Sequence, residues 1–474
     1  MRFSKVFIRL IFISLLAMTF ESCLNDRQVN PDAHDLTLFY INDPHGQLNN
    51  FAKIKQIVDE EKAKTNVLLV CAGDIFSGNP IVDQYSEKGY LIVDAMNKAG
   101  FDIAELGNHE FDYGIPILKD RMAQAEFDWI CANVHTGTSV LPQPDPYKTL
   151  TVGDLKITVL GLLETNGKPD DIIPSTHPWR VADLEFDRYS DIVGQYQHLK
   201  EQEDADLFLA LTHLGEYSDI NLANEYPYFD LIIGGHTHTP FEDKVNGIPI
   251  YRAGSHLSYL GKLEITVKDK KISRLISSSI NLNNYTEVDD ELKSVIDEYN
   301  NTPEFDEVIG YAPSHLSTTE LGCFYTTALK DYMNVDVSFQ NNGGIRAELD
   351  EGDITKLDIY NMDPFNNGSV VFTMTVGEIK DFFVHSGAGM HVSGISFEKT
   401  DTGLIIYDEE GAEMNDTESL TIGINDYIPA VYDAYFSYDE AEIRELTTAE
   451  SIIQYLKTIN SNVDYEGCNQ YFHY

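Results

Sequence analysis

The chain has 474 residues, of which 43% are hydrophobic and 11% aromatic, and its formal net charge is −44 at pH 7. This length and composition indicate a folded protein of two domains and exclude an intrinsically disordered one. The chain has 77 acidic residues against 33 basic ones, which excludes binding to nucleic acid or to anionic membrane surfaces, because both need clustered Lys and Arg.

The first 23 residues have the pattern of an export signal. Arg2, Lys5 and Arg9 precede an apolar stretch over residues 10–20, which is too short to cross a bilayer but fits the core of a signal peptide. Ser22-Cys23 follows and resembles a bacterial lipobox, in which the cysteine is lipidated. We therefore predict a signal peptide over 1–23 and an exported, periplasmic or cell-surface bacterial lipoprotein anchored at Cys23. The alternative is an ordinary secretory peptide in which Cys23 has no role.

The other cysteines are Cys71, Cys131, Cys323 and Cys468, and none of them forms a CxxC motif. Cys71 and Cys131 lie inside apolar runs, so we expect them to be small core residues. The spacing gives no reason to expect a disulfide framework.

Apolar, β-rich runs alternate with helical patterns in the first half of the chain. The helical patterns cover residues 48–64 and 90–99, and the alternation predicts a layered α/β domain. An alternating run at 263–267 indicates the edge of its sheet. The predicted strands are 36–42, 66–72, 101–106, 127–132, 156–164, 206–212 and 229–234.

An Asn-rich and then acidic stretch separates this half from a second apolar block. We predict a linker with one exposed helix at 283–305, between domains at 34–282 and 306–474. In the second domain we expect helices at 323–333 and 449–458 and strands at 335–339, 368–376 and 420–424.

Metal-ligand side chains follow five of the predicted strands. If those strands share one sheet, their polar tips lie together along its carboxyl edge. Oxygen and imidazole ligands without thiolate select divalent ions, and seven of them are too many for one tetrahedral site, so we expect two ions, with Asp74 as the bridge. A lone His or a Gly-Asp turn is usually structural, and Asp112 could cap a helix. The same pattern follows five strands, however, and this repetition argues against a purely structural role for the whole set. The predicted ligands are Asp43, His45, Asp74, Asn108, His213, His236 and His238.

These motifs resemble those of the calcineurin-like metallophosphoesterases. Three further motifs make the chain similar to the secreted 5′-nucleotidase and UDP-sugar hydrolase family: Asn42-Asp-Pro-His-Gly46, Gly107-Asn-His-Glu-Phe-Asp112 and Ala132-Asn-Val134. The resemblance covers nearly the whole mature chain. It implies an α/β fold with a four-layer α/β/β/α metallophosphoesterase domain at 34–282 and a smaller α+β substrate-binding domain at 306–474.

The resemblance also implies a role for each predicted site residue. One divalent ion (Zn, Mn, Co, Fe or Mg) would be held by Asp43, His45, Asp74 and His238, and a second by Asp74, Asn108, His213 and His236. His109 would be the second-sphere acid, oriented by Asp112.

The C-terminal domain carries a candidate substrate site at Asn341-Asn-Gly-Gly-Ile-Arg346. Its amides and guanidinium suit phosphate or ribose oxygens, although Arg346 could instead pair with Glu348 or Asp350. The stretch resembles the family's substrate-binding signature, which implies roles for Asn341 and Arg346. Two later loops resemble those that supply the aromatic rings for the base, here Phe365 and Tyr427, with Asp433 as the nearby acid.

The family pattern is altered in this domain. The family's Gly-Gly-Asp-Gly has become Val431-Tyr-Asp-Ala434, its Asn-Leu-Gly-Asn has become Glu320-Leu-Gly-Cys323, and a further phosphate-binding arginine has no counterpart. We expect an exported two-metal hydrolase that releases phosphate from nucleoside 5′-monophosphates or related nucleotides. The alternatives are a 2′,3′-cyclic-nucleotide phosphodiesterase, a UDP-sugar or nucleotide pyrophosphatase, and a nucleotide-binding lipoprotein without turnover. The sequence predicts no oligomeric state.

Overall fold

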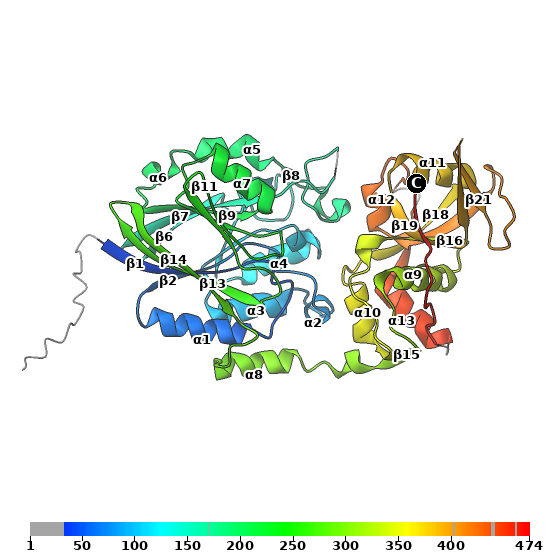
Figure 1. Cartoon of the computed structure of the whole chain (residues 1–474), viewed down its shortest axis with the longest axis horizontal. Helices are drawn as coiled ribbons and strands as arrows, with labels where there is room; N and C mark the ends of the chain where they lie inside the picture. Colours follow the sequence, from blue (N-terminus) through cyan, green and yellow to red (C-terminus); the bar gives the residue numbers. More distant parts are fainter. Residues whose placement is uncertain (1–32, 169, 402, 438–440, 460–461) are drawn as a thin grey trace, which may run out of the picture.

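The computed structural model describes residues 33–168, 170–401, 403–437, 441–459 and 462–474, and it arranges them in two lobes (Figure 1). The predicted signal peptide and Cys23 lie outside the described residues. Among the described helices, none is long and apolar enough to cross a membrane.

Two six-stranded sheets form the centre of the N-terminal lobe. The first contains, in order, β14 (Lys271–Asn281), β13 (Tyr259–Lys268), β1 (Ala33–Ile41), β2 (Asn66–Cys71), β3 (Ile103–Glu105) and β4 (Asp128–Ile130). The second contains β11 (Phe241–Val245), β12 (Ile248–Arg252), β10 (Leu231–Gly234), β9 (Leu207–His213), β7 (Leu155–Leu163) and β6 (Tyr147–Val152). Every predicted strand of this lobe is confirmed, and the strands divide between two sheets, as the four-layer architecture requires.

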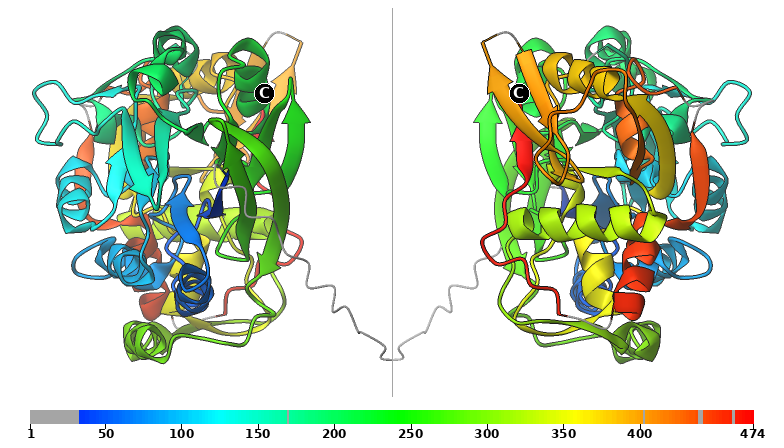
Figure 2. Two further views of the ribbon diagram at one scale, coloured as in Figure 1. Left: turned by 90° about the vertical axis from the view of Figure 1, so that its left-hand side faces the viewer. Right: turned by 90° about the vertical axis from the view of Figure 1, so that its right-hand side faces the viewer.

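The two sheets stack face to face on a shared apolar core. Leu38 and Val70 of the first sheet and Leu209 and Ile233 of the second all belong to this cluster of buried side chains. Helices cover both outer faces, as the end views in Figure 2 show. They are α1 (Phe51–Lys62), α3 (Tyr90–Ala99) and α4 (Ile115–Gln124) on one side, and α5 (Tyr189–Ile192), α6 (Leu199–Gln202) and α7 (Glu216–Glu225) on the other. The predicted four-layer α/β/β/α architecture is confirmed.

The prediction that the run at 263–267 marks a sheet edge is wrong. These residues belong to β13, which pairs with β1 on one side and with β14 on the other. The alternation arises because one face of β13 packs into the core between the sheets while the other face is more open. A strand alternates in this way wherever one of its faces reaches solvent, in the interior of a sheet as well as at its edge.

The linker helix is α8 (Asp290–Tyr299), and it is not fully exposed as predicted. Leu292 and Ile296 are buried in the same apolar cluster as α1, and the Asp289 side chain accepts the Leu292 amide at 2.8 Å as an N-cap. The helix is amphipathic, and its apolar side packs on the N-terminal lobe. The chain then continues into the second lobe (Figure 1).

The C-terminal lobe is built on a third six-stranded sheet. Its strands, in order, are β23 (Glu442–Thr447), β18 (Gly368–Thr375), β22 (Ser419–Asn425), β16 (Val337–Asn341), β19 (Gly389–Ser393) and β24 (Tyr471–His473). One face carries α9 (Thr318–Met333), α10 (Lys356–Met362) and α13 (Thr448–Ile459), and the other carries α11 (Val376–His385) and α12 (Tyr427–Val431). The predicted helices and strands of this half are confirmed, and the lobe is α+β.

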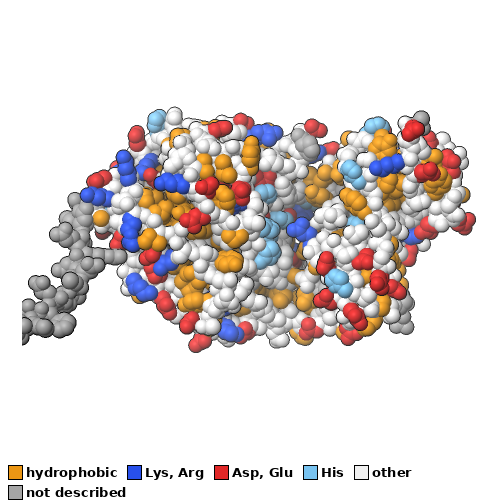
Figure 3. Space-filling model, viewed as in Figure 1, with side chains coloured by type: hydrophobic (Ala, Val, Ile, Leu, Met, Phe, Trp, Pro, Cys, Tyr) orange, Lys and Arg blue, Asp and Glu red, His pale blue; other side chains and the backbone are white. Residues whose placement is uncertain are grey.

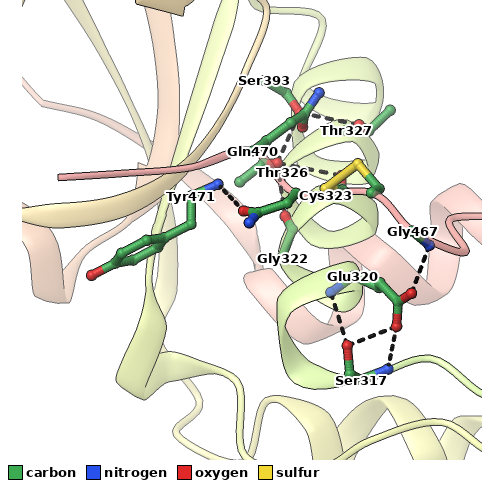
Figure 4. The surroundings of a disulfide bond; sticks show 12 residues. Ser317, Glu320, Gly322, Cys323, Thr326, Thr327, Ser393, Gly467, Gln470 and Tyr471 are labelled. Carbon is green, nitrogen blue, oxygen red and sulfur yellow. Dashed lines mark hydrogen bonds between the residues drawn. A yellow bond between two sulfur atoms is a disulfide. The ribbon is translucent and has the colours of Figure 1, made fainter. Parts of the chain in front are cut away.

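A disulfide in this lobe corrects the expectation drawn from the cysteines. Cys323 on α9 pairs with Cys468 in the C-terminal tail, 145 residues further on, and their Cα atoms are 6.4 Å apart. Glu320 on the same helix accepts the Gly467 amide at 2.6 Å, so the tail is fixed to α9 at two neighbouring points (Figure 4). The spacing gave no sign of the pair because it forms only when the tail returns across the lobe. Cys71 and Cys131 are buried free thiols, as expected.

We expect the disulfide to stabilise this lobe substantially. Closing a loop of this length restricts the unfolded chain, and removing such a bond typically costs about 2–4 kcal/mol. The double variant Cys323→Ser/Cys468→Ser should therefore unfold at a lower temperature than the wild type in non-reducing buffer. Wild type treated with reductant should unfold like the variant, and equal unfolding temperatures in all three samples would contradict this role.

Candidate metal centre

The predicted ligands lie where strands of both sheets end at the interface between the lobes. Asp43 and His45 follow β1, Asp74 follows β2, and His236 follows β10. All four residues adopt the left-handed backbone region, with φ between 47° and 70°. A positive φ is costly for a residue with a side chain, and it persists at functional sites where the surrounding structure enforces it.

The structure gathers the ligands into two clusters that share Asp74. In the first, His45 Nε2 lies 3.0 Å from His238 Nε2 and 3.9 Å from Asp74 Oδ2, and His238 Nε2 lies 3.5 Å from Asp43 Oδ1. Within each cluster the carboxylate oxygens and ring nitrogens able to bind a metal lie within 4.8 Å of one another.

The second cluster forms around His213 and Asn108. His213 Nε2 lies 3.0 Å from Asp74 Oδ2 and 3.2 Å from Asn108 Oδ1, and His236 Nδ1 lies 3.0 Å from the same amide oxygen. All seven predicted ligands therefore meet in one pocket.

The donor chemistry of the pocket fits divalent cations. His45 Nδ1 donates to the Ser77 carbonyl at 3.0 Å, so its Nε2 lone pair faces the ring nitrogen of His238. Asp43 Oδ1 is buried and has no hydrogen-bond partner. Burial lowers the pKa of His45 to about 3, which keeps the ring in the neutral form that binds metal. A neutral imidazole with a free ring nitrogen, beside a buried carboxylate oxygen that receives no donor, has the chemistry of a cation site.

His109 and Asp112 form a hydrogen-bonded pair beside the clusters. His109 Nδ1 lies 2.6 Å from Asp112 Oδ2, and Asp112 also accepts the hydroxyls of Ser77 at 2.6 Å and Thr176 at 3.0 Å. Burial opposes the charged imidazole, but the Asp112 and Asp74 carboxylates outweigh it and raise the pKa of His109 to about 9. The ring is therefore a proton donor at neutral pH. Asp112 is not a helix cap, because the next helix, α4, begins at Ile115 with Gly114 as its N-cap.

Glu110 is a buried residue of the motif to which the sequence gave no role. Its carboxylate accepts the backbone amides of Asp74 at 3.0 Å and Ile75 at 2.6 Å. These bonds fix the turn that carries Asp74. Its place in Gly107-Asn-His-Glu110 was a signal that could have identified it.

A cavity of about 330 Å³ lies between the lobes, next to the clusters. Asn108, His109 and Asp112 line it from the N-terminal lobe. The C-terminal lobe contributes four of the predicted substrate-binding residues, Asn341, Arg346, Phe365 and Tyr427. Figure 3 shows the hollow, with histidine side chains (pale blue) on one wall and basic side chains (blue) facing them.

The structure places the remaining alternatives as follows. The Arg346 guanidinium lies 5.5 Å from the centre of the Phe365 ring, whereas Glu348 and Asp350 lie 3.3 Å and 3.2 Å from His315. Asp433 does not line the cavity. Its carboxylate pairs with Lys168 at 2.6 Å and borders a separate hollow between the lobes.

Two family models match the chain. Residues 36–240 match the calcineurin-like phosphoesterase model, and residues 303–436 match the model of the 5′-nucleotidase C-terminal domain.

Several known proteins are similar over most of the chain. The trifunctional nucleotide phosphoesterase protein YfkN of Bacillus subtilis is 26% identical over 88% of this chain, but the chain spans only 33% of that protein. A 5′-nucleotidase of Vibrio cholerae is 26% identical over 78% of this chain and 80% of its own length. The crystal structure of a 5′-nucleotidase precursor from Thermus thermophilus shares the fold, with a TM-score of 0.75 at 22% identity over 90% of this chain and 97% of its own.

We expect Asp74→Asn to abolish metal binding and phosphate-ester hydrolysis, because an amide cannot supply the negative charge that both clusters share. Changes even to outer partners of metal ligands cost about 10- to 100-fold, so hydrolysis should fall by more than about 100-fold. Elemental analysis and phosphate release check this. Asp416→Asn, which removes an exposed carboxylate paired with Lys380 in the other lobe, is the matched control. Wild-type metal content and rate in Asp74→Asn would disprove the bridging assignment.

Proposed function

We propose that this chain, which belongs to the calcineurin-like phosphoesterases with a 5′-nucleotidase C-terminal domain, hydrolyses nucleoside 5′-monophosphates to nucleoside and phosphate. The chain is thus a metal-dependent phosphoesterase, and the proposal concerns its substrate. One observation carries it: a cavity lined by two of the predicted metal ligands, Asn108 and His236, also holds the His109–Asp112 pair, the Arg346 guanidinium and the rings of Phe365 and Tyr427. These groups match the phosphate, the sugar and the base of a nucleotide.

Each group of residues at the cavity has a separate role in the proposed reaction. Two divalent cations, when bound by the clusters, would act as Lewis acids toward phosphoryl oxygens and lower the pKa of an attacking water. His109 donates its Nε2 proton toward the phosphoryl or leaving oxygen as charge develops there. Asp112 holds the imidazole in the orientation and protonation state that this donation needs.

The C-terminal lobe binds the rest of the substrate. Arg346 offers paired N–H donors to phosphate or ribose oxygens, and its position over the Phe365 ring places both groups on one wall of the cavity. Phe365 and Tyr427 provide flat apolar faces against which any nucleobase can stack. The altered residues 431–434 and the position of Asp433 outside the cavity favour a site that is tolerant of base identity.

We also propose that the enzyme acts outside the cytoplasm, as a lipoprotein anchored at Cys23. The basic and apolar pattern of residues 1–23 supports export. The Cys323–Cys468 disulfide supports it independently, because such bonds persist in oxidising compartments.

A substrate panel tests the proposed reaction directly. Protein beginning after Cys23 should hydrolyse AMP to adenosine and phosphate faster than it releases phosphate from ribose 5-phosphate, opens 2′,3′-cyclic AMP to a monophosphate or cleaves UDP-glucose to UMP and glucose 1-phosphate. A chelator should stop the reaction, and added Mn²⁺ or Zn²⁺ should restore it. Preference for the cyclic or the sugar nucleotide would assign the phosphodiesterase or pyrophosphatase alternative instead. Binding of AMP by metal-loaded protein without phosphate release would indicate a nucleotide-binding lipoprotein.

Arg346→Ala should weaken AMP hydrolysis through substrate binding. Hydrogen bonds to charged groups contribute about 1.5–3 kcal/mol, so kcat/KM for AMP should fall by roughly 10- to 100-fold, mainly through a higher KM. Steady-state kinetics measures this. The control is Arg444→Ala, which removes an exposed arginine beside Glu442 and should behave like the wild type. An unchanged KM for AMP in Arg346→Ala would mean that this side chain does not contact the substrate.

A further inference from the structure

Residues 175–180, here called the bridging segment, connect the catalytic pair of one lobe to the base-binding wall of the other. The segment contacts the N-terminal lobe through two hydrogen bonds. The Ser175 carbonyl oxygen accepts from the Asn108 side-chain amide at 3.0 Å, and Thr176 Oγ1 donates to Asp112 at 3.0 Å. His177 and Arg180 of the same segment extend toward the C-terminal lobe and line the cavity.

Arg180 makes the most specific of these contacts. Its Nη2 lies 3.3 Å from the carbonyl oxygens of both Phe365 and Asn366, and its Nη1 lies 4.0 Å from Asp112 Oδ1. The side chain is 18% exposed. A guanidinium can hold these three oxygens at once because its donors form a rigid planar fork, which an ammonium lacks.

The loop that Arg180 contacts depends on the N-terminal lobe for its shape. Asn366 has a φ of 53°, a conformation that asparagine tolerates better than most residues. Its side chain accepts from Gln84 at 3.1 Å and donates to the Asp83 carbonyl at 3.3 Å. In its own lobe Phe365 has a backbone hydrogen bond to Asp363 and the Arg346 guanidinium over its ring, and the contacts from the other lobe add to these.

We propose that Arg180 is a positioning residue that fixes the Phe365 ring over the substrate cavity by tying its loop to Asp112. Its effect is to favour substrates that carry a base. The inference rests on the proposed nucleotide hydrolysis, since it assigns a specificity determinant to that site. Asp112 keeps its bonds to His109, Ser77 and Thr176 without Arg180, so the chemical step on a substrate without a base does not depend on this side chain.

A double-mutant cycle tests this assignment. AMP and ribose 5-phosphate share the reacting phosphate and the sugar, and only AMP has a base to stack on Phe365. Because residues in contact are energetically coupled, Arg180→Met should lower kcat/KM for AMP by about 10-fold, chiefly through KM. The same change should alter ribose 5-phosphate hydrolysis by less than about 2-fold. In a Phe365→Ala background, Arg180→Met should cost less than about 2-fold further on AMP.

Two further variants distinguish a positioning role of Arg180 from a general loss of contact between the lobes or a loss of folding. Lys168→Met removes the ion pair with Asp433, another contact between the lobes, and should leave both activities unchanged. Arg180→Lys keeps the charge beside Asp112 but not the fork, and should retain part of the AMP preference.

The proposal is overturned if Arg180→Met slows both substrates equally, if its effect multiplies fully with that of Phe365→Ala, or if Lys168→Met reproduces it. A wild type that does not prefer AMP to ribose 5-phosphate would refute base recognition itself, and with it both proposals.

Discussion

The structure depends on one electrostatic constraint: the seven predicted metal-ligand side chains converge on a site in which Asp43 Oδ1 is a buried carboxylate oxygen without a hydrogen-bond donor. The Asp43 carboxylate has a buried oxygen without a hydrogen-bond partner, and the Nε2 atoms of His45 and His238 lie 3.0 Å apart. A bound cation would give this oxygen the favourable contact that burial away from water removes. The two stacked sheets, the left-handed turns after the strands and the Glu110 carboxylate behind the Asp74 turn together hold the ligands in place.

In the proposed function, the second lobe gives this hydrolytic centre its selectivity. The metal clusters and the His109–Asp112 pair can act on many phosphate esters, because they contact only the reacting group. Groups that recognise a base or a sugar stand on the opposite wall of the cavity, on a lobe with its own core and its own disulfide. Selectivity therefore depends on how the two lobes are held together, and the bridging segment contacts both the catalytic pair and the ring-bearing loop.

The sequence predicted what is encoded locally. Apolar runs that end in Asp or His identified the strands and the ligands, because a buried strand and the polar turn after it lie within about ten residues. Contacts between distant residues were not predictable in this way. Four features depend on how separate elements pack: which strands share a sheet, the Cys323–Cys468 bond, the placement of Asp433 beside Lys168 and the contact of Arg180 with the Phe365 carbonyl. Arg180 in particular lies in the short 3-10 helix Pro178–Val181, in a stretch without a motif, so only the structure brings it to the site.

The most direct test of the account is the metal content of active protein, measured by elemental analysis together with the anomalous scattering of a crystal. The account predicts two divalent ions per chain, one beside His45 and His238 and one beside His213 and His236, with Asp74 between them. Phosphate release at full rate by protein that binds no ion in this pocket would contradict it.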